Sequence, residues 1–105
     1  MERREFEGFG GLRIVDDAFG APESSPVVLV HSGGQSKEFW HGSARALAEA
    51  GRYALCVDLR GHGESGHASD GRYDLDAQVQ DLRAVLSTLP SRALVVAAGL
   101  GGIIA

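Results

Sequence analysis

Three glycine-rich turns, each directly after an apolar run, are the segments of this sequence best suited to chemistry. They span residues 31–35, 58–65 and 97–102. Glycine lets the backbone turn sharply and lets a ligand approach the chain closely. Backbone N–H groups in such turns can stabilise an oxygen that gains negative charge, and the loss of one such donor costs on the order of 10²–10³ in rate. The candidate chemistry is therefore acyl transfer or anion binding by backbone donors.

Strands and helices that alternate along the chain would position these turns. The expected strands are 6–9, 12–19, 27–30, 53–57 and 94–97, and the expected helices are 37–50 and 75–89. The strands from 27 onward are apolar without alternation, which is typical of strands covered on both faces. Ser36 and Asp74 are plausible N-caps, while Gly51 and Pro90 would end the two helices.

This order of elements predicts an α/β fold in a single domain over residues 1–105. The first two strands would form an antiparallel hairpin across Gly10-Gly11. The strand–helix–strand units that follow imply right-handed crossovers. We therefore expect a mostly parallel sheet of about five strands with an N-terminal antiparallel hairpin.

Composition and charge narrow the class of protein. Hydrophobic residues make up 44% and charged residues 23% of the chain, as in ordinary globular proteins. The net charge of −4 gives no reason to expect nucleic acid or an anionic membrane as a partner. Cys56 is the single cysteine, which fits a reducing compartment. Residues 1–5 carry mixed charge and no apolar run follows them, so we expect a cytoplasmic protein.

The three turns, at their spacing, resemble segments of the α/β-hydrolase-fold superfamily. Residues 27–34 resemble its strand and oxyanion turn, H-G-x or H-G-G-G, with Ser32 in the first glycine position. Residues 58–65 match the D-x-R-G-x-G-x-S turn that follows the family's fourth strand. Residues 95–102 lie where the nucleophile elbow G-x-S-x-G belongs. The resemblance covers about residues 12–105.

The resemblance implies a three-layer αβα fold with eight strands and a Ser-Asp-His triad in that chain order. This chain would then supply the first five strands, and the acid and the base would lie beyond Ala105. The backbone N–H groups of Gly33 and Leu100 would form the oxyanion hole. The implied reaction is hydrolysis of an ester or related bond in a small-molecule substrate, with no cofactor and no metal ion.

Gly99 occupies the position at which this family carries its nucleophile. A residue with a Cβ at that strained corner costs about 1–3 kcal/mol, which glycine avoids. Glycine also has no attacking oxygen, and Ala98 and Leu100 cannot replace it. We therefore expect this chain to be catalytically incompetent by itself. The alternative is that the chain is a non-catalytic binding or interaction member of the fold. Gly99 would then be needed only for the backbone conformation of the turn.

The turn at 97–102 also permits a dinucleotide-binding interpretation. It is one residue away from the G-x-G-x-x-G fingerprint, with Ala97 in the first glycine position. That fingerprint expects an acidic residue about 20 positions later, and no such residue is present in this sequence. This remains the lesser alternative.

Several other residues are expected to be structural. His31 would order the loop that follows it, and Asp58 and Arg60 would fix their turn through hydrogen bonds and an ion pair. Trp40 is expected in the core or in a pocket wall, and Cys56 should behave as a small hydrophobe. Two carboxylates, Glu64 and Asp76, are expected to be solvated.

The strand 94–97 raises the question of self-association. In the arrangement that the resemblance implies, this strand is central and is flanked by strands that this sequence does not encode. Left alone, it would be an apolar edge with unpaired N–H and C=O groups. We therefore expect the chain to self-associate through this edge.

Overall fold

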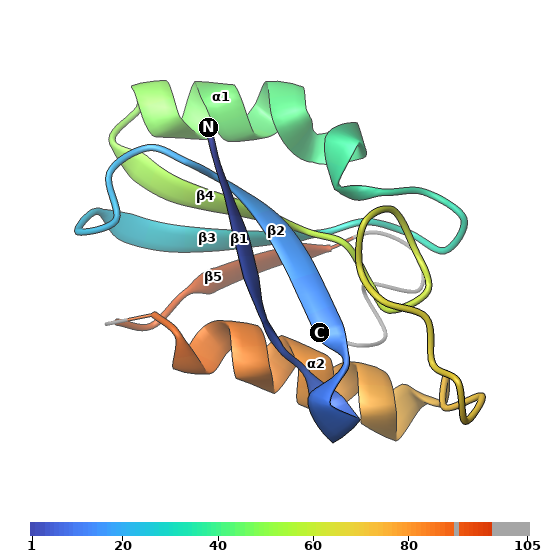
Figure 1. Ribbon diagram of the computed structural model, residues 1–105. Coiled ribbons are helices and arrows are strands. Elements are labelled where there is room, and N and C mark those ends of the chain that lie inside the picture. The colour runs from blue at the N-terminus through green and yellow to red at the C-terminus, as the bar shows by residue number, and fades with distance from the viewer. Residues whose placement is uncertain (90, 98–105) are drawn as a thin grey trace.

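The computed structural model describes residues 1–89 and 91–97, which form a five-stranded sheet with helices on both faces (Figure 1). The strands are β1 (Glu2–Glu7), β2 (Arg13–Phe19), β3 (Ser25–Val30), β4 (Arg52–Val57) and β5 (Leu94–Ala97), in the order β1-β2-β4-β3-β5. Strands β4, β3 and β5 are parallel, whereas β1 pairs with β2, and β2 with β4, in antiparallel fashion. The predicted α/β fold with an N-terminal hairpin is confirmed.

The helices cover opposite faces of this sheet. Helix α1 (His41–Glu49) lies on one face and α2 (Leu75–Ser87) on the other (Figure 1). Two short 3₁₀ helices, η1 (Phe9–Gly11) and η2 (Lys37–Trp40), precede β2 and α1. Among the described residues, no helix has the length and apolar character needed to cross a membrane. The result is three layers, with the sheet in the middle.

Strand β3 shows why its sequence is apolar without alternation. Val27 and Leu29 pack into the core beneath α1, while Val28 and Val30 pack into the core beneath α2. All four side chains are buried. A strand covered on both faces needs apolar residues at every position, so β3 is a rigid support for the loop that leaves it at His31.

The first helix does not begin as the sequence predicted. Instead of one helix over 37–50, the chain forms η2 and then α1. The hydroxyl of Ser36 donates to the Glu38 carboxylate and does not cap the helix. The Lys37 backbone N–H donates to the Asp58 carboxylate at 2.7 Å, which ties this first turn to the end of β4. The predicted helix end is confirmed, since Gly51 has a left-handed φ of 85°.

The hairpin also differs from the prediction of a strand over residues 6–9. Strand β1 begins at Glu2, four residues before the predicted start, and ends at Glu7, after which the chain turns through η1. The Phe9 N–H donates to the Asp81 carboxylate of α2 at 2.8 Å, which draws this segment out of the sheet and onto the helix. A Cβ at Gly8 would collide with Asp81 and with Ile14 of β2. The turn is therefore shaped by α2, which lies far away in the sequence.

Strand β5 has one partner, β3, within the described part of the chain. Leu94 at its start is 61% exposed. We propose that two copies associate through the outer edge of β5, because unpaired strand edges template further pairing. Sedimentation velocity should then show a dimer or larger species that dissociates in the Leu94→Lys variant.

Leu75 supplies the matched control for this test. It is 49% exposed at the start of α2, away from the strand edge, so Leu75→Lys adds the same charge at a different surface. The Leu75→Lys variant should sediment as the unmodified chain does. A monomeric unmodified chain would contradict the proposal.

Candidate functional site

The loop at 31–37 and the turn at 58–65 meet at one edge of the sheet. Strands β3 and β4 are parallel, and Val30 lies opposite Val57, so both segments leave the sheet side by side. The Gly34 N–H donates to Nε2 of His62 at 3.0 Å, which joins them directly. Two of the three glycine-rich turns are thus brought together.

The loop after β3 presents backbone to solvent at Gly33. The Gln35 N–H donates to the Ser32 carbonyl at 3.2 Å, which closes a four-residue turn. The left-handed position of this turn is Gly34, with φ of 81°. Gly33 is exposed, and its N–H donates to no acceptor within residues 1–89 and 91–97.

His31 anchors the start of the loop. Its ring is buried, and Nε2 accepts the Leu59 N–H at 3.0 Å, so Nδ1 carries the proton and donates to the Ser32 carbonyl at 2.7 Å. Burial lowers the pKa of His31 below its ordinary value of 6.5. The imidazole is therefore neutral and structural, as the sequence predicted.

The lowered pKa of His31 makes stability depend on pH. Below pH 6.5 the unfolded chain binds a proton at His31 that the folded chain resists, so the free energy of unfolding should fall as the pH drops. Urea unfolding between pH 7.5 and 5.5 should show this fall. The His31→Gln variant should be less stable throughout but should lose that part of the pH dependence. If the free energy of unfolding falls with pH equally in both proteins, His31 is not the source of the pH dependence.

The turn at 58–65 is held by the residues that define its motif. The Asp58 carboxylate accepts the Lys37 N–H at 2.7 Å and the Glu64 N–H at 2.9 Å. The Ser65 hydroxyl donates to the Asp58 carbonyl at 2.7 Å and accepts the Val15 N–H at 2.9 Å. Asp58 and Ser65 thus fix both ends of the turn, and Asp58 also fixes the far end of the loop at Lys37.

Glycine is required at two positions of this turn, both for its left-handed backbone conformation and because neighbouring atoms leave no room for a Cβ. Gly61 has φ of 75° and Gly63 has φ of 49°. A Cβ at Gly61 would lie 2.6 Å from the Tyr73 ring, and one at Gly63 would collide with the Asp58 carboxylate. The R-G-x-G spacing therefore lets the turn close tightly over Asp58.

Arg60 forms its ion pair with a helix and not within its own turn. Its guanidinium donates to both oxygens of Asp81 in α2, at 2.6 and 2.9 Å, and both side chains are buried. It also donates to the carbonyl oxygens of Phe9 and Arg72. The expectation that Arg60 is structural is confirmed, and its partner Asp81 was not foreseen from the sequence.

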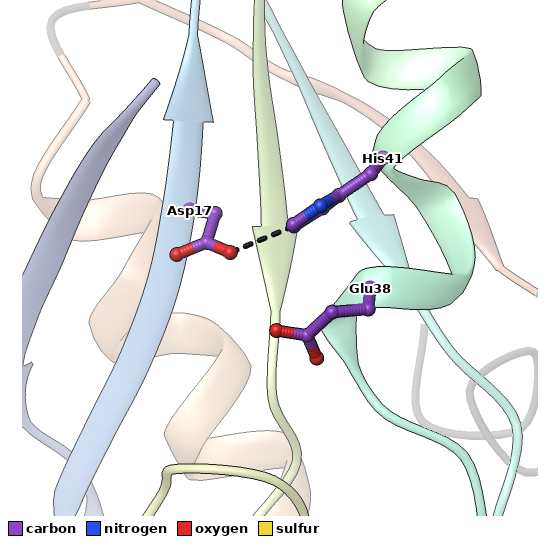
Figure 2. Close-up of side chains that lie close together, drawn as sticks. All are labelled: Asp17, Glu38 and His41. Carbon is purple, nitrogen blue, oxygen red and sulfur yellow. Dashed lines mark hydrogen bonds and ion pairs between the residues drawn. The ribbon is translucent and has the colours of Figure 1, made fainter.

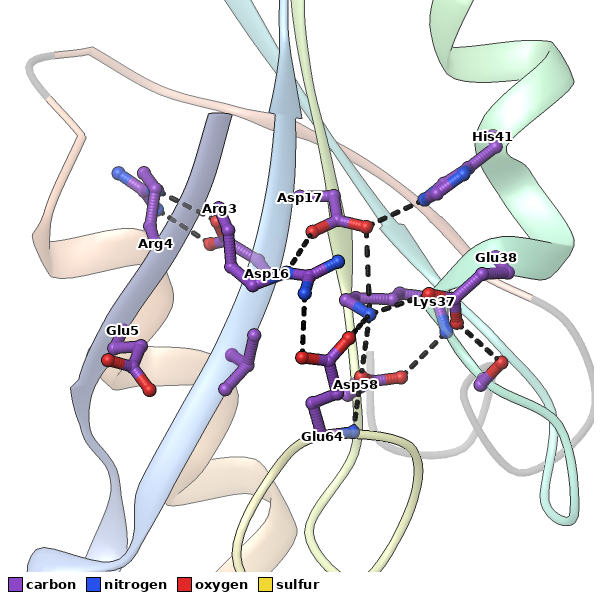
Figure 3. Close-up of polar contacts among 12 residues, drawn as sticks. Arg3, Arg4, Glu5, Asp16, Asp17, Lys37, Glu38, His41, Asp58 and Glu64 are labelled. Carbon is purple, nitrogen blue, oxygen red and sulfur yellow. Dashed lines mark hydrogen bonds and ion pairs between the residues drawn. The ribbon is translucent and has the colours of Figure 1, made fainter. Parts of the chain in front are cut away.

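A buried lysine beside the loop was also missed by sequence reasoning. The Lys37 side chain is 0% exposed. Its ammonium lies near four carboxylates that converge from β2, η2 and the turn after β4 (Figure 3). The distances to its nearest oxygens are 2.7 Å for Glu38, 2.9 Å for Glu64, 3.3 Å for Asp58 and 3.6 Å for Asp17. We call this group the Lys37 cluster.

The Lys37 cluster favours the charged forms of Lys37 and Glu38. Burial alone would lower the pKa of the Lys37 ammonium, but hydrogen bonds to Glu38 and Glu64 outweigh it and the pKa is raised. The hydrogen bond from Lys37 lowers the pKa of Glu38 to about 2. Glu64 is paired with Lys37 and with Arg3, which corrects the prediction of a purely solvated carboxylate. The loop is thus held at its far end by the contacts of Lys37 with these carboxylates.

Asp17, Glu38 and His41 form the arrangement in this region closest to a metal site (Figure 2). One ligand atom from each lies within 4.8 Å of the others, and His41 Nε2 is 2.7 Å from Asp17 Oδ2. Imidazole and carboxylate are common metal ligands. However, the Lys37 ammonium lies 3.6 Å from the same Asp17 oxygen and 2.7 Å from Glu38. The lysine already supplies the positive charge that these carboxylates require.

Two predicted site residues, Gly99 and Leu100, and nearly all of the turn at 97–102 lie outside the described residues. The described part of the chain does show where this segment begins. Ala97, the last residue of β5, is opposite Val30 at the end of β3. Strand β5 therefore ends at the same edge of the sheet from which the Gly33 loop departs.

Cys56 lies in the core beneath α1 and the partly buried Trp40 packs against that core, as predicted. Cys56 is fully buried, and burial raises the pKa of its thiol to about 12. A thiol with so high a pKa is a poor nucleophile at neutral pH. Cys56 therefore takes no part in the candidate site.

Curated proteins with similar sequences include several hydrolases. An esterase of Mycobacterium tuberculosis is 39% identical over 80 residues, covering 75% of this chain and 26% of the esterase. A non-heme chloroperoxidase of Kitasatospora aureofaciens is 35% identical over 81 residues, covering 76% of this chain and 29% of that protein. The chain thus spans between a quarter and a third of the length of these relatives.

Solved structures with the same architecture extend the likeness to nearly the whole chain. The thioesterase domain from the curacin biosynthetic pathway superposes with a TM-score of 0.92 at 30% identity, covering 100% of this chain and 39% of that domain. An epoxide hydrolase from Vigna radiata gives a TM-score of 0.89 at 27% identity, covering 98% of this chain and 33% of the enzyme. Residues 25–105 also match the model of the alpha/beta hydrolase fold family. The strand order, the two joined turns and these matches together show that the chain belongs to the alpha/beta hydrolase fold family.

Proposed function

We propose that the Gly33 loop is the oxyanion loop of a hydrolase acting on ester or related bonds. The backbone N–H groups of Gly33 and Leu100 would be its two donors. The observation that carries the proposal is that Gly33 is exposed and that its N–H has no acceptor within the described residues. It stands in a loop that is tied down on either side, at His31 and at Lys37.

The physical basis is preorganisation of the donor. When a nucleophile attacks an acyl carbon, the carbonyl oxygen becomes an oxyanion, and donors already aimed at it need no reorganisation. His31 fixes the start of the loop on Leu59, and the Asp58 carboxylate fixes its end at Lys37. The loop can therefore keep the Gly33 N–H in place while charge develops on the substrate.

The substrate class follows from this chemistry together with the relatives. An oxyanion loop serves reactions that pass through a tetrahedral intermediate at an acyl carbon. The similar proteins include an esterase, a lipase and a thioesterase domain. We therefore propose a small acyl ester or thioester as the substrate of a complete protein containing this segment.

We further propose that the chain alone does not turn over such substrates. Position 99 carries glycine, so no side-chain oxygen is present where the family places its nucleophile. Cys56 is buried and protonated, so it cannot substitute. The purified chain should therefore release no p-nitrophenol from p-nitrophenyl acetate above the buffer rate. Release at a catalytic rate would contradict this part of the proposal.

The oxyanion loop itself can be tested by adding a nucleophile that needs no general base. A thiolate attacks esters without help from a base. In the Gly99→Cys variant, p-nitrophenyl acetate should acylate the new thiol once. Per thiolate, this acylation should be at least about 10²-fold faster than at a cysteine that has no oxyanion donors beside it. The measurement is the single-turnover rate as a function of pH.

Ser69→Cys is the matched control for that experiment. Ser69 is exposed in the loop before α2, so its thiol would react without neighbouring backbone donors arranged for the purpose. The Ser69→Cys rate should be that of an ordinary exposed thiol. Equal acylation rates per thiolate in the two variants would contradict the proposal that positions 33 and 100 form an oxyanion hole.

A further inference from the structure

The His62 side chain connects the two segments of the site through both of its ring nitrogens. Nε2 accepts the Gly34 N–H at 3.0 Å, and Nδ1 lies 3.0 Å from the Arg60 carbonyl oxygen. A backbone N–H can only donate and a carbonyl can only accept. The proton must therefore reside on Nδ1, with Nε2 bare, and the imidazole must be neutral for both bonds to form.

The turn that carries His62 is itself held in place. The neighbouring Arg60 is fixed by the buried Asp81 carboxylate of α2. The His62 ring also packs against the His31 ring, with centroids 5.1 Å apart. A continuous series of contacts therefore runs from α2 through Arg60 and His62 to the backbone of Gly34.

We propose that His62 is a positioning residue for the Gly33 loop. Gly34 is the left-handed residue of the turn, so fixing its N–H fixes the peptide next to Gly33. His31 and Lys37 hold the two ends of the loop, and His62 holds its tip. The consequence for catalysis rests on the proposed oxyanion function, whereas the hydrogen bond itself does not.

The hydrogen bond can be tested without any activity. In the ¹⁵N-labelled chain, NMR should show a scalar coupling between the Gly34 amide nitrogen and His62 Nε2, because such couplings pass across N–H···N bonds. The Nε2 resonance should have the shift of an unprotonated nitrogen. A His62 ring protonated on Nε2 at neutral pH, with no coupling to Gly34, would overturn the proposal.

The positioning role can be tested by two substitutions in the Gly99→Cys variant. His62→Phe keeps a ring beside His31 but removes the acceptor, and His62→Gln keeps an acceptor of similar reach. We expect His62→Phe to lower the acylation rate by up to about 10²-fold, the cost of a reacting group misplaced by about 1 Å. We expect His62→Gln to restore most of it. Faster hydrogen exchange at Gly34 should accompany the loss in His62→Phe.

His67→Phe is the control, since His67 is exposed in the same region and should leave the rate unchanged. Unchanged rates and unchanged Gly34 exchange in His62→Phe would contradict the positioning role. If the Gly99→Cys thiol shows no acceleration while the Gly34–His62 coupling is present, the oxyanion proposal fails and the hydrogen bond stands. If His62→Phe does not fold, the scalar coupling in the unmodified chain is the test: its presence supports the contact of His62 with Gly34, and its absence overturns the proposal.

Discussion

Replacing Asp81 by alanine should lower the free energy of unfolding by about 3–5 kcal/mol, the usual cost of breaking a buried ion pair. The Arg60 guanidinium is 2% exposed and would lose both of its carboxylate bonds, at 2.6 and 2.9 Å. The Phe9 N–H would also lose its acceptor. Urea unfolding followed by circular dichroism at pH 7 measures the change.

The control for Asp81 lies one and a half turns earlier on the same helix. Asp76 is exposed, and its contact with Arg72 is 4.0 Å long between exposed side chains. Asp76→Ala should change the free energy of unfolding by no more than about 0.5 kcal/mol. Similar losses in the two variants would mean that the buried pair does not hold the turn at 58–65 onto α2.

Replacing Gly63 by alanine is the second large effect that we expect, at about 2–4 kcal/mol. Gly63 has φ of 49°, a conformation that costs energy for any residue with a Cβ. The added methyl group would also displace the Asp58 carboxylate, which accepts the backbone N–H groups of Lys37 and Glu64. Chemical unfolding measures the loss of stability.

Gly71 separates these two contributions. Its φ is 74°, but a Cβ there would meet no atom within 4 Å. Gly71→Ala should therefore show the conformational cost alone, about 1 kcal/mol. If Gly63→Ala costs no more than Gly71→Ala, the Asp58 carboxylate is not the reason that the motif requires glycine at this position.

The sequence was informative wherever structure is determined locally. Asp74 caps α2, since its carboxylate accepts the Ala77 N–H, and Gly51 ends the first helical segment in a left-handed conformation. The continuous apolar run at 27–30 correctly indicated a strand covered on both faces. The motif at 58–65 correctly indicated a tight turn after β4, because Asp58 accepts the Glu64 N–H within the turn and Gly63 lets the chain close over Asp58.

The Lys37 cluster could not be predicted, because its members come from three separate segments of the chain, β2, η2 and the turn after β4. Lys37 stands at the start of a helical pattern, where a lysine ordinarily faces solvent. One signal was present, because Asp16 and Asp17 stand side by side within an otherwise apolar strand and both are fully buried. Two buried acids need cationic partners, but the sequence does not say which ones. Arg4 pairs with Asp16, and Arg3 and Lys37 pair with Asp17.

The other errors have the same origin. The segment after β1 was expected to continue as a strand, yet its backbone bonds to Asp81 of α2. The partner of Arg60 is the same residue. A single buried carboxylate on a distant helix therefore determines both features, and nothing in the spacing near residues 9 or 60 reveals it.

The central claim is that Gly33 and Leu100 contribute backbone donors to one oxyanion site. Donor nitrogens that each lie about 3 Å from a shared oxygen can be no more than about 6 Å apart. The direct measurement is a nuclear Overhauser effect between the two assigned amide protons in the ¹⁵N-labelled chain. We predict a clear cross-peak between them. Its absence, with both amides assigned and each showing cross-peaks to its own neighbours, would contradict the claim.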